Sequence, residues 1–322
     1  MSSINTNTAA MTALKSLQAT NSALQQTQQR ISTGLRVNDA SDNAAYWSIA
    51  TTMRSDNKAL GAVDDALGLG AAKVDVAYTG INSAIDVVDE IKSKLVAARE
   101  PGVDRDKIQS EIGELQNQLT SISGSASFSG ENWLSFDGAS QTKDVVASFN
   151  RDTSGNVSVG TISIDISAVK LIGDNGAGSP VNDGILNTAN DYGSNAGNEI
   201  DISVMAIDIS TTGLTDADIN SAETGAGFTD ILDEMISSVD TALSSMTTAA
   251  SDLGATKGRI DMQKDFVGNL MDAIDRGVGT LVDADMTKES TRLSALQTQQ
   301  ALGTQALSIA NSASQSILSL FR

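Results

Sequence analysis

The side chains in this sequence that could carry chemistry are almost all carboxylates. Adjacent pairs could act as general acid and base, and a cluster of aspartates could bind Ca²⁺. The chain has no histidine and no cysteine, which removes the commonest general base, the commonest zinc ligands and every disulfide. The pairs fall on the predicted solvent side of helices, and no calcium-loop spacing surrounds the cluster. We therefore predict no enzyme activity, no cofactor and no metal site. The candidates considered are Asp64-Asp65, Asp233-Glu234, and Asp208 with Asp216 and Asp218.

The composition limits the class of protein. The 322 residues carry a net charge of −19, which argues against binding nucleic acid or an anionic membrane surface. Apolar residues make up 40% and aromatic residues only 3%, which favours thin helix–helix layers. The sequence has no apolar run long enough for a transmembrane helix, and the first 25 residues lack the pattern of an ordinary secretory signal.

Residues 49–98 predict the element that organises the chain. Steps of four and three land almost always on apolar residues, which is the heptad pattern of a helix with one buried seam. The helix should end at Glu100-Pro101, and a third helix should run from Asp104 to Gly124 and fold back on it. The pattern returns over residues 232–274, and Gly277 and Gly279 should then interrupt this helix. The seam residues are Ile49, Met53, Leu60, Val63, Leu67, Val74, Ile81, Val88, Leu95, Leu232, Val239, Leu253, Ile260 and Leu270.

Both ends of the chain predict helices with a heptad seam and very little charge. Residues 1–36 and 291–322 contain no acidic residue. A solvent-exposed helix is normally rich in Lys and Glu, so we expect other copies of the chain to cover these faces. The predicted polymerisation residues are Leu14, Leu17, Leu24, Ile31, Leu35, Leu293, Leu296, Leu307, Ile317, Leu318, Leu320 and Phe321.

A short connector follows Gly34, and we expect Ser41 or Asp42 to cap the next helix. Its polar residues are either simple caps or a bend that sets how subunits pack, and these two readings are about equally supported. The residues concerned are Arg36, Asn38, Asp39 and Asp42.

The central region is different in character and predicts a small β module. Residues 145–149 and 157–166 should form strands joined by a turn at 152–156, and residues 200–209 a further strand with a bulge. The chain is thus predicted to be mainly α, with long antiparallel coiled-coil helices from its two halves and a hairpin-like layout.

Several motifs in this order resemble the bacterial flagellins. They are Ile4-Asn5-Thr6-Asn7, the run from Ile31 to Asn38 with Asp39, Asp42, Ala44 and Ala45, Phe128-Ser129-Gly130 with Leu134, the run from Asp283 to Glu289, and Ile317-Leu318-Ser319-Leu320. The resemblance covers roughly residues 1–145 and 228–322. The acidic variant surface is similar to that of alphaproteobacterial members.

The resemblance implies a structural subunit of the helical flagellar filament that serves swimming motility. Residues 1–35 with 284–322 would form an inner tube, residues 36–170 with 228–283 a coiled-coil rod, and residues 171–227 a small outer module. The chain would be exported through the flagellar type III apparatus and become extracellular. Its partners would be copies of itself, sister flagellins, an export chaperone at the C-terminal helix, and the filament cap and hook-junction proteins.

One departure from the family concerns the vertebrate innate flagellin receptor. That receptor recognises members with a basic Gln-Arg-Val-Arg run, where this chain reads Asp89-Glu90-Ile91-Lys92, and this difference argues against recognition. Two alternatives stay open from the sequence. One is a hook-filament junction protein, present in few copies, and the other is a secreted adhesin in which the β module binds.

Overall fold

The computed structural model describes residues 7–136, 138, 141–174, 180–181, 183–188, 190–192, 200–210 and 228–320. It gives the backbone alone at 174, 180–181, 190–192, 200–202, 228–230 and 313–320. The chain forms two compact units, Met1–Ala59 with Leu270–Arg322 and Leu60–Asn269. Two long helices, α2 (Ala44–Ala98) and α5 (Phe228–Val282), contribute residues to both. The prediction of a mainly helical chain with a small β region is confirmed.

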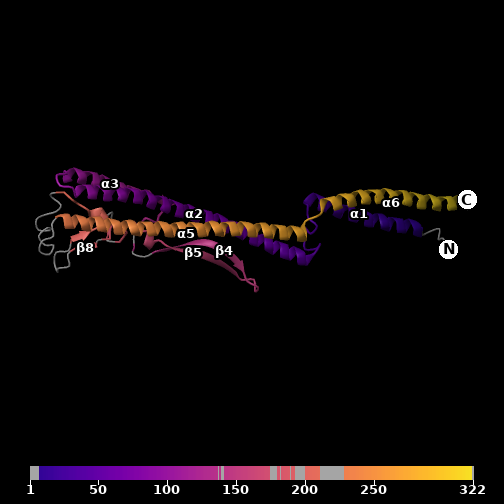
Figure 1. The fold of residues 1–322 in the computed structure, drawn as a ribbon. Helices are drawn as coiled ribbons and strands as arrows, with labels where there is room; N and C mark the ends of the chain where they lie inside the picture. The colour runs from indigo at the N-terminus through magenta and orange to yellow at the C-terminus, as the bar shows by residue number, and fades with distance from the viewer. Residues whose placement is uncertain are drawn as a thin grey trace. The chain divides into compact units, whose positions relative to one another are not determined.

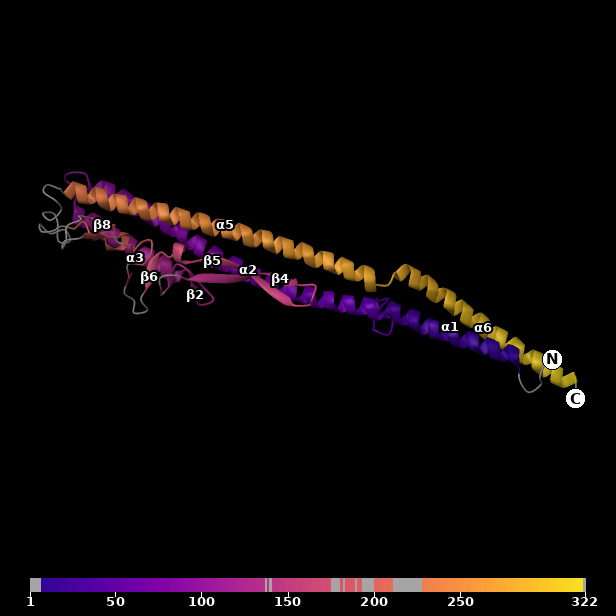
Figure 2. The same ribbon diagram turned by 90° about the horizontal axis from the view of Figure 1, so that it is seen from below.

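The core of the second unit is the seam between three helices. Helix α3 (Arg105–Ser125) follows the turn after α2, and in Figures 1 and 2 it lies along the same part of α2 that α5 accompanies. Most seam side chains of these helices are buried, as the heptad spacing requires, although Ile108, Leu115 and Ile122 of α3 are only half-buried. The largest buried ones are Leu67, Ile81, Ile91, Leu95, Ile112 and Leu119, with Val239, Met246 and Ile260 from α5.

Charged pairs at the edge of this seam fix its register. Lys92 Nζ lies 2.5 Å from Asp240 Oδ1, and Arg99 Nη1 lies 2.9 Å from Asp233 Oδ1. Lys257 pairs with Asp75. From one pair to the next, the residue number on α2 rises by as much as the number on α5 falls. The two helices are therefore antiparallel and keep one register along this stretch. Side chains at the edges of a coiled-coil seam commonly select its register in this way.

A β hairpin packs on the two long helices of this unit. Strands β4 (Thr142–Arg151) and β5 (Val157–Asp165) pair antiparallel, with a bulge between Val146 and Ser148. Val145, Ala147, Ile162 and Ile164 form the buried face. A Cβ on Gly70 would lie 2.4 Å from Val145 Cγ1, so the helix needs glycine where the hairpin touches its backbone.

The remaining strands are short. They are β1 (Ser127–Phe128), β2 (Glu131–Asn132), β3 (Ser135–Phe136), β6 (Ile172–Asp174), β7 (Pro180–Val181), β8 (Asn190–Tyr192) and β9 (Ile200–Ile202). β1 pairs with β2, β6 pairs with β3 and β7, and β8 pairs with β9. The 3₁₀ turn η1 (Ser167–Val169) follows β5, and η2 (Val204–Ala206) follows β9. The predicted strand over 200–209 is therefore wrong after Ile202, because η2 turns the chain so that Val204, Ile207 and Ile209 are all buried.

The first unit holds the end helices and a second, small core. Helices α1 (Thr8–Thr33) and α6 (Met286–Leu320) lie side by side in Figures 1 and 2. The small core contains Val37, Ala50, Val278 and Val282. We expected Gly277 and Gly279 to interrupt the last long helix, but α5 continues through both to Val282. A helix tolerates an internal glycine at a cost of about 1 kcal/mol, which this core can offset. No helix among the described residues could span a membrane.

Candidate functional site

The end helices present most of the predicted polymerisation residues at or near the surface. Leu14 is exposed and Leu296 is buried. Six further residues are half-buried: Leu17, Leu24, Ile31, Leu35, Leu293 and Leu307. The side chains of Ile317, Leu318 and Leu320 and the whole of Phe321 lie outside the described residues. The pairing of α1 with α6 therefore leaves a large part of both seams accessible.

Polar contacts hold α1 against α6. Asn7 caps α1 by accepting a hydrogen bond from the Ala10 amide, and its Nδ2 donates to the Ala310 carbonyl at 2.9 Å. Gln300 Nε2 donates to Asn21 Oδ1 at 2.8 Å. Asn21 and Gln300 fall on the heptad spacing of Leu14 and Leu293, but their pairing across two helices is visible only in the structure. Such polar pairs specify register in a helix pair.

Other apolar side chains on the end helices face away from the α1–α6 pair, and the seam prediction missed them. Met11, Leu302 and Ile309 are strongly exposed. Charge is sparse around them, since α1 carries only Lys15 and Arg30. Exposed apolar side chains with so little charge around them favour an interaction surface.

The structure brings three of the four connector residues together in one turn, while the fourth, Arg36, contacts the end of α5. The Asp42 carboxylate accepts hydrogen bonds from the amides of Asn38 and Asp39, at 3.1 and 3.4 Å, and Asn38 Nδ2 donates to Asp39 Oδ2. Arg36 Nη2 donates to the Leu281 carbonyl at 2.7 Å. The expected helix cap at Ser41 or Asp42 is wrong: Asn43 Oδ1 accepts from the Tyr46 amide, because Asp42 is already engaged in the turn.

The same connector is tied by its backbone to the segment after α5. The amides of Arg36 and Val37 both donate to the Val282 carbonyl, and the Ala284 amide donates to Gly34. Leu35 and Asp283 form an isolated antiparallel bridge. Gly34 closes α1 at a φ of 72°, a left-handed conformation that favours glycine. The two connecting segments therefore run as one hydrogen-bonded pair.

The predicted seam residues are buried or half-buried in the structure, with one exception. Ile49 is 49% exposed, and its neighbour Ala50 occupies the buried position instead. Asn57 contacts Asp275, so the antiparallel register places Ile49 opposite Asp283, just beyond the end of α5. Among the described residues, α5 therefore offers no helical turn opposite Ile49. Met53 and Leu270 are half-buried, and the remaining eleven predicted seam residues are buried.

The described carboxylates that could have carried chemistry form ordinary ion pairs and hydrogen bonds or lie unburied on a helix. Asp233 pairs with Arg99, and Asp208 Oδ1 accepts from the Ser210 amide at 2.8 Å. Asp64 and Asp65 lie on α2 with neither of them buried, and Asp216 and Asp218 lie outside the described residues. Within the described part of the chain, no group of three or more metal-ligating side chains occurs.

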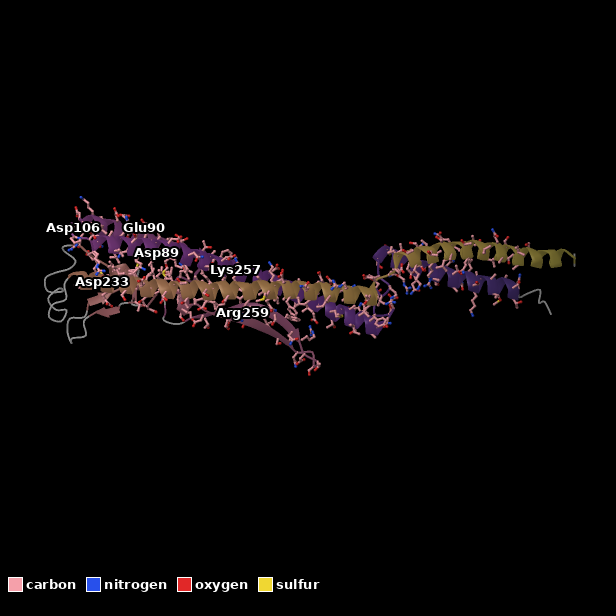
Figure 3. All side chains as sticks on the ribbon, in the orientation of Figure 1. Asp89, Glu90, Asp106, Asp233, Lys257 and Arg259 are labelled. Carbon is pink, nitrogen blue, oxygen red and sulfur yellow. The ribbon has the colours of Figure 1, made fainter. Side chains whose placement is uncertain are left out.

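The charge pairs between α2 and α5 in the second unit are partly exposed. Hydrogen bonds from Lys92 to Asp240 and from Lys257 to Asp75 raise the pKa of each lysine above its ordinary value. Figure 3 shows Asp89, Glu90 and Asp106 on α2 and α3, with Lys257 and Arg259 farther along α5. This arrangement can stabilise and orient helices, but it does not enclose a reactive group.

The comparisons with known proteins agree with this arrangement. Residues 4–139 match the bacterial flagellin N-terminal helical region, and residues 236–321 match the bacterial flagellin C-terminal helical region. Flagellin C of Rhizobium meliloti (strain 1021) is 53% identical over 325 aligned residues. Flagellin A of Rhizobium meliloti is 46% identical over 395, and a flagellin of Brucella melitensis biotype 1 is 47% identical over 323. Each alignment covers 100% of both chains. The chain therefore belongs to the bacterial flagellin family, and it is a structural subunit that assembles with its own kind into the flagellar filament.

Proposed function

We propose that the chain polymerises through helices α1 and α6 and that the connector sets the angle at which these helices meet the rest of the subunit. One observation carries the proposal. The two end helices pack on each other, yet exposed apolar side chains such as Met11, Leu302 and Ile309 cover their outer faces. Head-to-tail contacts that do not close a ring generate an open helical filament.

We also propose that the subunit has the three domains that the sequence indicates. Residues 1–35 with 284–322 form the inner tube, residues 36–170 with 228–283 the coiled-coil rod, and residues 171–227 the outer module. The backbone pairing of Leu35 with Asp283 supports a boundary at that point. The chain acts as a structural protein and not as an enzyme, and it lacks histidine and cysteine throughout.

Export and partners follow from the family and remain proposals. The subunit leaves the cell through the flagellar type III apparatus and functions outside it. An export chaperone would cover the apolar surface of α6 before secretion, and cap and hook-junction proteins would offer matching end helices. The exposed acidic pair Asp89 and Glu90 argues against recognition by the innate flagellin receptor (Figure 3).

The assembly proposal is tested with a charge placed on the end helices. Leu14→Glu adds a carboxylate to an exposed apolar position of α1, whereas Val96→Glu adds one to an exposed position of α2 in the other unit. Leu14→Glu should abolish filaments seen by electron microscopy while the circular dichroism of the soluble subunit stays unchanged. Val96→Glu should still form filaments. Normal filaments from the Leu14→Glu protein would overturn the proposal.

A further inference from the structure

The first turns of α2 expose three large apolar side chains that neither unit covers. Tyr46 is 41% exposed, Trp47 38% and Ile49 49%. The chain contains only two tryptophans and three tyrosines, so two of its five largest aromatic side chains meet here. Aromatic residues of this size are enriched at protein interfaces and depleted on bare surfaces.

The exposure has a geometric cause. Tyr46 and Ile49 continue the seam stripe of α2 that includes Met53 one turn later. The antiparallel register places Ile49 opposite Asp283, where α5 has already ended. Tyr46 extends the stripe still farther beyond the end of α5. The seam thus overhangs its partner helix by one turn.

The overhanging turn is rigidly held. Ala50 packs in the small core with Val37, Val278 and Val282, which fixes the rotation of α2 about its own axis. Asn43 caps the helix by accepting from the Tyr46 amide, and its carbonyl accepts from the Trp47 amide. A preorganised apolar group loses little conformational entropy when a partner covers it.

The local charge indicates what kind of partner fits. Residues 44–53 carry no charge, whereas the chain as a whole carries −19. Two copies of so acidic a chain repel one another unless they meet where charge is low. The uncharged window also adjoins the connector that leads to the charge-poor helix α1, within the same unit. The family assembles from identical copies, so the neighbour that fits this surface is a second copy of the chain.

We propose that Tyr46, Trp47 and Ile49 form a separate contact with a neighbouring copy in the filament, in addition to the contacts of the end helices. The inference rests on the proposed assembly function and adds a second surface to it. In the soluble subunit this surface faces solvent, and polymerisation buries it.

Tryptophan fluorescence tests the proposal on the unaltered protein. Trp133 is 3% exposed and stays shielded in either state, so acrylamide quenching of the soluble subunit reports Trp47. Acrylamide is neutral and is not repelled by the acidic chain. The accessible fraction of the fluorescence should largely disappear in filaments. Filaments confirmed by electron microscopy whose Trp47 is quenched as strongly as in the subunit would overturn the contact and leave the assembly function intact.

A paired substitution provides the second measurement. The variant Tyr46→Ser with Trp47→Ser should raise the critical concentration for assembly about tenfold, as expected when interface anchors are lost. Met262→Ser removes a still more exposed apolar side chain from α5 in the other unit and should change the critical concentration less than about twofold. Equal effects of the two variants would overturn the contact. Failure of the unaltered chain to assemble at all would overturn both the contact and the proposed function.

Discussion

Arg30 Nη1 lies 3.4 Å from Glu289 Oε1, and this ion pair joins the last turn of α1 to the first turn of α6. Each charge also sits at the helix end that favours it, a cation at the C-terminus and an anion at the N-terminus. Glu289 is buried and its Oε2 has no hydrogen-bond partner among the described residues. The pair therefore ties together the two helices that we propose carry assembly.

Arg30→Ala should leave the buried Glu289 carboxylate without its cation and weaken the α1–α6 pairing by about 1–2 kcal/mol. The measurement is the temperature at which assembled filaments dissociate, followed by light scattering. Arg30→Ala with Glu289→Ala should dissociate at a higher temperature than Arg30→Ala alone, since the isolated buried charge is gone. A double variant that is no more stable than the single one would show that the pair does not act as a unit.

Gly70→Ala tests the close approach of the hairpin to α2. The new Cβ would meet Val145 Cγ1 at 2.4 Å, and we expect a loss of about 1–3 kcal/mol in the free energy of unfolding. Gly61→Ala on the same helix is the matched control, because a Cβ there meets nothing within 4 Å. The control should gain about 0.4–1 kcal/mol from the reduced entropy of the unfolded chain. Urea denaturation of the soluble subunit measures both.

Acid should weaken the attachment of the β region through Glu131. A hydrogen bond from Lys73 Nζ, at 2.8 Å, is the main cause that lowers the pKa of Glu131 below its ordinary 4.5, and the nearby charges of Lys73 and Lys143 add to it. A lowered folded-state pKa means that the stabilisation is complete above pH 4.5 and is lost as the pH falls through the lower value.

Glu131→Gln removes this titration, so the stability difference between the unaltered chain and the variant should shrink as the pH falls from about 5 to about 3. Urea denaturation at each pH gives that difference. A difference that stays constant over this window would rule out the Lys73–Glu131 pair as its source.

The α2–α5 charge pairs predict a rescue by exchange. Lys92→Asp places two carboxylates together at the Asp240 contact and should lower the stability only slightly, because both groups are partly exposed. Lys92→Asp with Asp240→Lys restores opposite charges and should recover most of the loss. Both variants are compared by urea denaturation at low and at high salt, where screening should reduce the effect. A double variant as unstable as the single one would contradict a register role.

Removing Asp183 should destabilise the β region more than removing its partner, the buried Lys170. Lys170 Nζ lies 2.8 Å from Asp183 Oδ2 and 3.0 Å from the Gly138 carbonyl, and it sits over the Phe136 ring. Asp183→Ala leaves a buried ammonium without its anion, which should cost about 3 kcal/mol or more. Lys170→Met leaves only the partly exposed Asp183 and should cost less. Thermal unfolding of the soluble subunit ranks the two, and the reverse order would contradict this account.

Local pattern was sufficient for the long helices and the hairpin. A four-three repeat such as Leu67, Val74 and Ile81 has one stable solution, a helix buried along one stripe, and the structure has it. The alternation of Ile162 and Ile164 with polar residues likewise fixed which face of β5 is buried. The scarcity of charge on α1 and the absence of acidic residues from both ends of the chain likewise indicated self-association.

The sequence alone therefore determined the elements, the seam and the family, because periodicity and motifs are local properties of the chain. Only the tertiary structure decided where each seam ends. Ile49 has a seam residue's spacing, but whether it is buried depends on the last turn of α5, more than two hundred residues away. In the same way, Gly70 interrupts the heptad pattern in sequence and becomes the docking point of Val145 in space. Contacts between distant segments set these outcomes, and no local pattern encodes the length of a partner helix.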